Sequence, residues 1–142
     1  MNVLNVHTHE GPMSERPDEV HLVVPASAEY AMVARLVASG LASRRGMSYD
    51  DVEDLRVVIA EVCRLLVGPA VSDDRGDGTI AFAFGIGADR LTLEATSSTG
   101  RPEFEPDEHD LAAGLLLALT DEYEADLDGD QPRVRIVKQY TH

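Results

Sequence analysis

The sequence predicts an α+β fold, a two-layer sandwich in which three helices cover one face of a mixed, mainly antiparallel sheet. Two pairs of strand-like segments are joined by short links, which predicts two antiparallel hairpins. The helical segments come as a consecutive pair and a single helix, and this order excludes a regular βαβ alternation. The chain has 142 residues, of which 44% are hydrophobic, so we expect one domain with its own core.

The first two elements are a strand and a helix. Residues 19–25 are rich in Val and alternate weakly, which predicts a strand that Pro25 ends. Ser27 is a good N-cap for the helix that follows, and Gly40 or Gly46 is expected to end it. The apolar stripe expected to face the core comprises Tyr30, Val33, Val37 and Leu41, with Met32 and Leu36 alongside.

The second helix has the clearest pattern in the chain. Ser48 and Asp51 form a variant capping box, with Asp in place of Glu or Gln, and Gly68 with Pro69 ends the helix. The expected core positions recur at spacings of 3, 4, 3 and 4, with two flanking positions: Val52, Leu55, Ile59, Val62 and Leu66, with Val58 and Leu65. This continuous apolar face predicts tight packing against the rest of the fold.

The second half of the chain contains the two hairpins and the third helix. A Gly-rich turn over 85–89 joins strands expected over 79–84 and 90–96. Asp110 is expected to cap a very apolar helix over 111–119, which should pack beside the second helix. The strands of the last hairpin are expected over 122–126 and 133–140.

Composition limits the classes of partner. Acidic residues number 26 and basic residues 12, giving a formal charge of −14, which disfavours binding to nucleic acid or to an anionic membrane. The natural partners of such a surface are cations or basic proteins. A single cysteine, Cys63, excludes an internal disulfide and fits a reducing compartment, and no apolar run is long enough to span a bilayer. We therefore expect a soluble cytoplasmic protein.

The polar start of the chain predicts a flexible arm over residues 1–18, followed by a single domain over residues 19–142. His7 and His9 in the arm supply two imidazoles without a third ligand. An EF-hand loop that began at Asp126 would place a valine where calcium needs a bidentate acid. The sequence therefore predicts no metal site.

Several local motifs resemble one protein family. The strongest is YDDVEDLRVVIAE over residues 49–61, at the start of the second expected helix. Val-Pro-Ala at 24–26 and Leu-Thr-Asp-Glu at 119–122 accompany it. The pattern resembles the anti-sigma factor kinases of the RsbW and SpoIIAB type, which implies the GHKL (histidine-kinase-like, Bergerat) ATPase fold. The likeness covers residues 19–140 and is nearest to divergent actinobacterial members, since Arg outnumbers Lys eleven to one.

The resemblance implies where a nucleotide would bind. In the family, the second helix carries a general-base Glu and, four residues later, an Asn that helps to hold magnesium. Here the Glu corresponds to Glu61, and the Asn position is Leu65, which offers no oxygen ligand. The family's Asp that accepts a hydrogen bond from adenine corresponds to Ser97, which would bind adenine weakly.

The phosphate-binding part departs from the family in the same way. The Gly-Leu-Gly-Leu motif falls on Asp110 to Ala113, so both glycines are lost: Asp110 would repel a triphosphate, and Ala112 replaces the second glycine. A family Thr on the last strand corresponds to Val137. Four of the five nucleotide-contacting elements are missing, which leaves Glu61 as a vestigial base. We therefore expect neither ATP nor magnesium as a cofactor.

Three functions fit these observations. The first is an anti-sigma factor without kinase activity, which sequesters an alternative sigma factor in a stress response and is released by a STAS-domain anti-anti-sigma partner. The second is an active Ser/Thr protein kinase that uses ATP and magnesium to phosphorylate the STAS partner. The third is another acidic adaptor on the same fold. The missing motifs favour the first.

The resemblance also implies how the chain would meet its partners. In the family, partners contact the first helix and the region near the nucleotide pocket. Arg35 lies beside the expected apolar stripe of this helix, which makes it the candidate interface residue. Family members often dimerise through the first strand, so a homodimer is expected.

Overall fold

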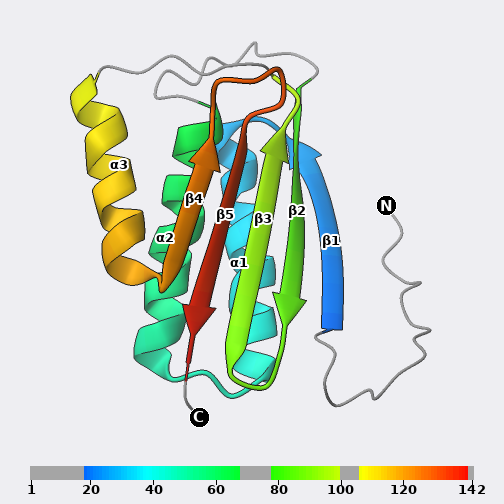
Figure 1. The fold of residues 1–142 in the computed structure, drawn as a ribbon. Helices are drawn as coiled ribbons and strands as arrows, with labels where there is room; N and C mark the ends of the chain where they lie inside the picture. The colour runs from blue at the N-terminus through cyan, green and yellow to red at the C-terminus, as the bar shows by residue number, and fades with distance from the viewer. Residues whose placement is uncertain (1–17, 68–77, 100–105, 141–142) are drawn as a thin grey trace.

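The computed structural model describes residues 18–67, 78–99 and 106–140, which form two layers (Figure 1). The elements in chain order are β1 Asp18–Pro25, α1 Ala28–Arg44, α2 Tyr49–Val67, β2 Thr79–Ile86, β3 Arg90–Ser97, α3 Pro106–Leu119, β4 Glu122–Asp126 and β5 Arg133–Gln139. The expected arm, with His7 and His9, lies outside the described residues apart from Asp18, which begins β1. The arm therefore stays a prediction.

The sheet has the strand order β1-β2-β3-β5-β4, and β1 and β4 form its two edges. The expected α+β sandwich is confirmed, and both expected hairpins are present as the pairs β2–β3 and β4–β5. All four pairings of these described strands are antiparallel, so the sheet is more regular than the mixed one expected. The helices lie on one side of the sheet, with α2 packed against both α1 and α3 (Figure 1).

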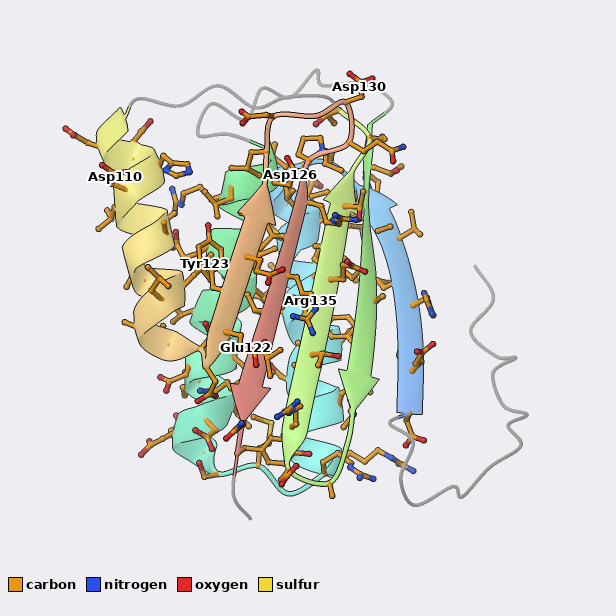
Figure 2. The ribbon with its side chains drawn as sticks, in the orientation of Figure 1. Asp110, Glu122, Tyr123, Asp126, Asp130 and Arg135 are labelled. Carbon is orange, nitrogen blue, oxygen red and sulfur yellow. The ribbon has the colours of Figure 1, made fainter. Side chains whose placement is uncertain are left out.

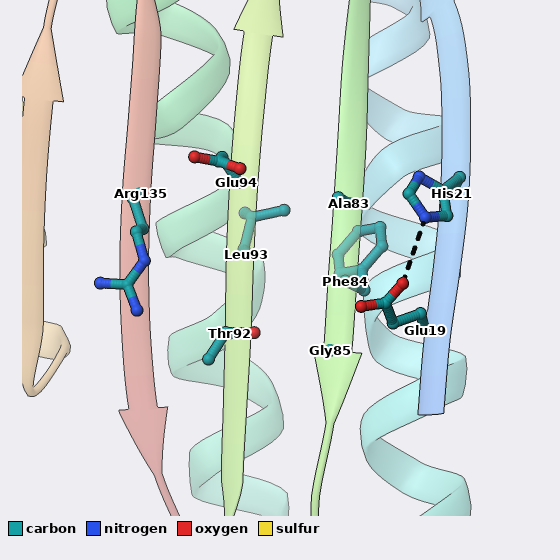
Figure 3. Close-up of a pocket in the computed structure, with 9 residues that line it drawn as sticks. All are labelled: Glu19, His21, Ala83, Phe84, Gly85, Thr92, Leu93, Glu94 and Arg135. Atoms are coloured by element: carbon teal, nitrogen blue, oxygen red, sulfur yellow. Dashed lines mark ion pairs between the residues drawn. The ribbon is translucent and has the colours of Figure 1, made fainter. Parts of the chain in front are cut away.

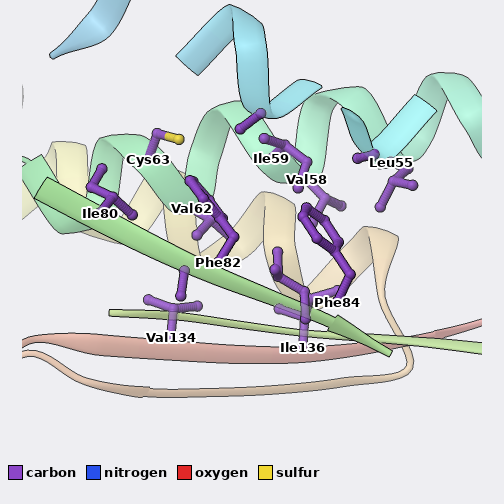
Figure 4. Close-up of a cluster of buried hydrophobic side chains, with 14 of the residues drawn as sticks. Leu55, Val58, Ile59, Val62, Cys63, Ile80, Phe82, Phe84, Val134 and Ile136 are labelled. Carbon is purple, nitrogen blue, oxygen red and sulfur yellow. The ribbon is translucent and has the colours of Figure 1, made fainter. Parts of the chain in front are cut away.

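The core lies between α2 and the sheet (Figure 4). The 3-4 pattern of α2 is confirmed, because Val52 is half-buried and all the other expected core positions are fully buried. The expected cap is also confirmed, since the Ser48 hydroxyl accepts a hydrogen bond from the Asp51 N–H at 3.1 Å. On the sheet side the largest buried side chains are Phe82, Phe84, Leu91, Leu93 and Ile136.

The expected core stripe of α1 is correct only in part, because Val37 and Leu41 are partly buried against the core while Tyr30 and Val33 are exposed. Ala34, Ala38 and Ala42, spaced four residues apart, are the fully buried positions of this helix. The four residues Tyr30, Met32, Val33 and Leu36 are exposed, and we call them the α1 patch. Apolar residues occur on every side of α1, so the apolar pattern does not select a face. The small alanine side chains allow α1 to approach its neighbours closely, and the face that carries them is therefore the one that is buried.

The ends of α1 agree with the expected signals. The Ser27 hydroxyl accepts a hydrogen bond from the Glu29 N–H at 3.3 Å, which satisfies one of the donors left open at the helix start. The helix ends at Arg44, and Gly46 follows with a φ of 82°. Only glycine adopts this backbone conformation at low cost, so Gly46 rather than Gly40 ends the helix.

The third helix begins earlier than expected. It starts at Pro106, so Asp110 lies inside the helix and is not its N-cap. Proline is favoured at the first helical position, because that residue's N–H has no partner within the helix. Ala112 and Leu116 are buried, in agreement with the expected packing beside α2, while Leu111 and Leu117 are exposed. The helix therefore uses only part of its apolar surface in the core.

A buried lysine joins three elements. The Nζ atom of Lys138 on β5 donates a hydrogen bond to the Leu119 carbonyl, the last residue of α3, at 3.1 Å. The same atom lies 3.8 Å from Asp51 and 3.9 Å from Asp54, both on α2. The Lys138 side chain is 8% exposed, and these contacts compensate for its removal from water. Lys138 thus fixes the end of α3 and the first turns of α2 on the sheet.

Candidate functional site

The residues implied for a nucleotide site lie toward one end of the fold. Glu61 and Leu65 belong to the C-terminal half of α2, and Ser97 is the last residue of β3. Asp110 lies near the same end on α3 (Figure 2). Residues 68–77 and 100–105, which connect the elements there, lie outside the described part of the chain. The geometry of the site therefore comes from the helices and strands alone.

The two α2 residues implied for catalysis and metal binding make their contacts within the protein. Leu65 is fully buried in the core, so its side chain is packed among apolar groups and supplies no oxygen to a cation. Glu61 is almost fully buried, and its carboxylate accepts a hydrogen bond from Nε of Arg64 at 3.1 Å. A general base must accept a proton from substrate, and the contact with Arg64 engages Oε1, one of the two carboxylate oxygens of Glu61.

Ser97, the residue implied for adenine binding, makes hydrogen bonds with a residue close to it in sequence. Ser97 is fully buried, and its hydroxyl lies 2.7 Å from the Thr99 hydroxyl. The same oxygen accepts a hydrogen bond from the Thr99 N–H at 3.0 Å. The Thr99 side chain in turn crowds Gly78, where an added Cβ would lie 2.1 Å from Thr99 Cγ2. Two of the three hydrogen bonds that the Ser97 hydroxyl can make are therefore used in closing the end of β3.

The two α3 positions point in different directions. The Asp110 side chain is 83% exposed and lies 3.6 Å from Nδ1 of His109. Ala112 is buried on the core side of the helix. Residues two apart lie on nearly opposite sides of a helix, so one ligand cannot face both side chains. Asp110 therefore contributes to the outer surface of α3, away from the helix N-terminus where a phosphate would bind.

Val137 does not join the other five residues. Its neighbours Ile136 and Lys138 point toward the helices, as the Leu93–Ile136 pairing and the contact between Lys138 and Leu119 require. Side chains alternate along a strand, so Val137 points to the opposite, helix-free face of the sheet. The structure thus places the positions on α2, β3 and α3 on the helix-covered side of the sheet or in the helix layer, and the position on β5 on the other side.

The helix-free face of the sheet has a depression of about 320 Å³ (Figure 3). The small residues Ala83, Gly85 and Thr92 form its floor. Charged groups surround them, including a His21–Glu19 pair at 3.6 Å. No group of three or more potential metal ligands is found within residues 18–67, 78–99 and 106–140. Among the residues implied for the nucleotide, only Val137 lies on this face, where its register partner Thr92 lines the depression.

The interface candidate on α1, Arg35, is less exposed than its apolar neighbours, and its role at an interface stays a prediction. Arg35 is half-buried beside Cys63, whose pKa is raised by burial to about 12, an effect that the Arg35 charge partly opposes. The exposed residues are instead those of the α1 patch, including Leu36, which is 63% exposed. Sequence reasoning missed this surface, although the apolar residues on every side of α1 are a signal for it.

Comparisons with known proteins bear on this arrangement. The chain is 40% identical over 86 residues to serine-protein kinase RsbW of Bacillus cereus (strain B4264), which is 61% of this chain and 52% of that protein. The resemblance to RsbW is confirmed. RsbW of Bacillus thuringiensis subsp. konkukian (strain 97-27) is 41% identical over 81 residues, 57% of this chain and 49% of the relative. This chain thus spans about half the length of the RsbW relatives it matches.

The fold of an RsbW domain matches as well. A crystal structure of the RsbU and RsbW domains of Rv1364c from Mycobacterium tuberculosis superposes with a TM-score of 0.65. The match covers 87% of this chain and 33% of that one at 14% identity, so it supports the GHKL-like fold. No protein-family model matches the chain. Among the described helices, none combines the length and apolar character that a membrane span requires.

Proposed function

We propose that this RsbW-like chain is an anti-sigma factor that sequesters an alternative sigma factor. The carrying observation is the α1 patch, four apolar side chains exposed on a helix of a highly acidic protein. Isolated exposed apolar residues are ordinary, but a contiguous group on one helix marks an interaction site. Sigma factors carry basic DNA-binding surfaces, and a chain with a net charge of −14 associates with such surfaces rapidly.

Release of the sigma factor by a STAS-domain anti-anti-sigma partner completes the proposed cycle, in the cytoplasm and in response to stress. The confirmed resemblance to RsbW supports this part of the proposal, because exchange between two protein partners is what the family resemblance implies. The two partners would compete for the chain. The STAS protein would then set how much sigma factor stays bound, through its own concentration and affinity.

A matched pair of variants tests the surface. Leu36→Ser in the α1 patch should weaken binding of the sigma factor at least tenfold, because it removes an apolar anchor from the centre of the contact. Val57→Ser on α2 is the control, since Val57 is also an exposed apolar residue and belongs to no proposed binding surface. The partner is first identified by mass spectrometry of proteins that co-purify with the chain, and affinity is then measured by calorimetry. Equal affinities of wild type and Leu36→Ser would refute the role of the α1 patch.

We further propose that the chain acts without kinase activity. The buried Leu65, the Arg64-bound Glu61 and the locally bonded Ser97 support this proposal. Calorimetric titration with ATP and magnesium should give no heat of binding up to millimolar nucleotide. Two lost hydrogen bonds to charged groups cost about 3 kcal/mol or more, which weakens binding over a hundredfold.

The alternative is an active Ser/Thr kinase that phosphorylates the STAS partner. The name serine-protein kinase of the RsbW relatives and the retained Glu61 favour it. A micromolar Kd for ATP with magnesium, lost in Glu61→Ala, would establish this alternative. Transfer of labelled phosphate to a STAS protein would establish it independently.

A homodimer through β1 is also proposed. The strand β1 is an edge of the sheet, hydrogen-bonded to β2 on one side, and Val23 on it is half-exposed. An open edge is a ready site for pairing with a second strand. Light scattering at micromolar concentration should give a mass of twice 15.4 kDa. A mass of one chain at that concentration would contradict the dimer.

A further inference from the structure

One edge of the molecule, formed by α3, β4 and the turn after β4, is strongly acidic. Residues 106–132 contain nine acidic residues and neither Lys nor Arg. All nine are exposed: Asp107, Glu108, Asp110, Asp121, Glu122, Glu124, Asp126, Asp128 and Asp130. Four of these carboxylates are labelled in Figure 2: Asp110 on α3, Glu122 and Asp126 on β4, and Asp130 on the turn after β4. Arg135 on β5 lies 3.5 Å from Glu122, and the strand register places Arg135 opposite Glu124 and Arg133 opposite Asp126, so two arginines partly compensate the β4 carboxylates.

Apolar side chains are exposed on the same edge. Leu111 and Leu117 are 68% and 62% exposed, which ranks them among the most exposed large apolar residues of the described chain. Gly114 and Ala118 lie on the same side of α3, opposite the buried Ala112 and Leu116. An added Cβ at Gly114 would meet nothing within 4 Å, so the surface between the two leucines is low and open. We call Leu111, Gly114, Leu117 and Ala118 the α3 patch.

We propose that the α3 patch and its acidic surroundings are a docking surface for an amphipathic helix of another protein, with Lys or Arg beside its apolar stripe. The two leucines and the open glycine between them can receive apolar side chains of an approaching helix, as in ridge-into-groove packing. Asp107 and Asp110 lie on the exposed side of α3, with Asp107 one turn before Leu111 and Asp110 directly before it, and both would pair with the basic residues.

Charge decides which occupant the surface takes. A second copy of the chain would bring the same nine carboxylates to the contact, and each copy carries a net charge of −14. Like charges across an interface oppose association, whereas a basic helix is attracted and oriented. The inference goes beyond the proposed function, because it concerns a surface separate from the α1 patch. It stands even if the chain binds no sigma factor.

Two synthetic peptides test the proposal on the full chain. The probe is a helical peptide of about 18 residues, or five turns, with one Leu stripe flanked by Lys. The control peptide has Glu in place of every Lys. Titration of the isotope-labelled chain with the Lys peptide should shift the amide resonances of α3 and β4 and leave those of the α1 patch in place. Added salt should weaken the binding, and the Glu peptide should not bind.

Variants at equally exposed leucines give the second readout. Leu117→Ser should weaken binding of the Lys peptide about tenfold, while Leu36→Ser should leave it unchanged. Both variants should unfold at the wild-type temperature, because both residues are more than 60% exposed. Equal binding of the two peptides, or shifts that map to α1, would overturn the proposal. So would a dimer of the chain that Leu117→Ser dissociates, because the occupant would then be a second copy.

Discussion

Replacing Ile59 by Ala is expected to lower the free energy of unfolding by about 2–5 kcal/mol. Ile59 is fully buried in the centre of the α2 stripe, between the helix layer and the sheet (Figure 4). Truncation removes apolar contacts and leaves a cavity that α2 cannot close, because its neighbours on both sides are also fixed in the core. Urea denaturation followed by circular dichroism measures the change.

The matched control for this prediction is Val57→Ala on the same helix. Val57 lies two residues away and is exposed, so its truncation should change the free energy of unfolding by no more than about 0.5 kcal/mol. The denaturant dependence should stay the same in both variants, since neither changes the surface exposed on unfolding appreciably. An unchanged denaturation midpoint for Ile59→Ala would mean that the register of α2 is wrong.

Replacing Leu65 by Asn is expected to destabilise the fold by about 3 kcal/mol or more and to create no binding of ATP. Leu65 is fully buried, so the substitution removes apolar contacts worth about 2 kcal/mol. It also places an amide in an apolar environment, which costs about 1–3 kcal/mol when the amide has no hydrogen-bond partner. Denaturation with and without ATP and magnesium measures both effects.

Leu65→Met separates the two contributions. Methionine conserves most of the volume and adds no hydrogen-bonding group, so this control should cost less than about 1.5 kcal/mol. If the pocket is instead intact, Asn would supply the oxygen ligand that the family uses. Leu65→Asn would then gain about 2.7 kcal/mol of stability at ATP concentrations of 100 times its Kd, which would contradict the prediction.

The two long helices show what an apolar pattern can predict. On α2, polar residues separate the apolar ones at helical spacing, so a single face remains that can be buried. On α1, apolar residues surround the helix, and the buried face follows from size instead. Ala34, Ala38 and Ala42 permit close packing, which the larger Tyr30 and Leu36 would prevent. Which neighbour a helix approaches, and how closely, depends on the tertiary structure.

The candidate site was predicted in its residues but not in its surroundings. The positions of Glu61, Leu65 and Ser97 follow from the family motif, and all three lie toward one end of the fold. Arg64 follows Glu61 by three residues, and side chains at this spacing are neighbours on a helix, so their hydrogen bond could be anticipated from the sequence. The engagement of Ser97 by Thr99 depends on the backbone bend after β3, which no pattern of residue types specifies.

Two further differences have signals that were present in the sequence. Pro106 is a favourable first residue of a helix, and this signal competes with the expected N-cap at Asp110. Alternation along the last strand places Val134, Ile136 and Lys138 on one face and Val137 on the other. The assignment of Val137 came from matching the family in sequence, and the alternation of the strand argues against it.

The burial of Lys138 has a consequence for the chemical reactivity of the chain. Lys138 is the only lysine among the 142 residues, and its amine is held by the Leu119 carbonyl and two carboxylates. Acylating reagents and enzymes that acetylate or tag lysine need a free, uncharged and accessible amine. No lysine of the folded chain meets that condition. An acyl group found on Lys138 therefore records a moment when β5 and α2 had separated, which makes this residue an internal reporter of partial unfolding.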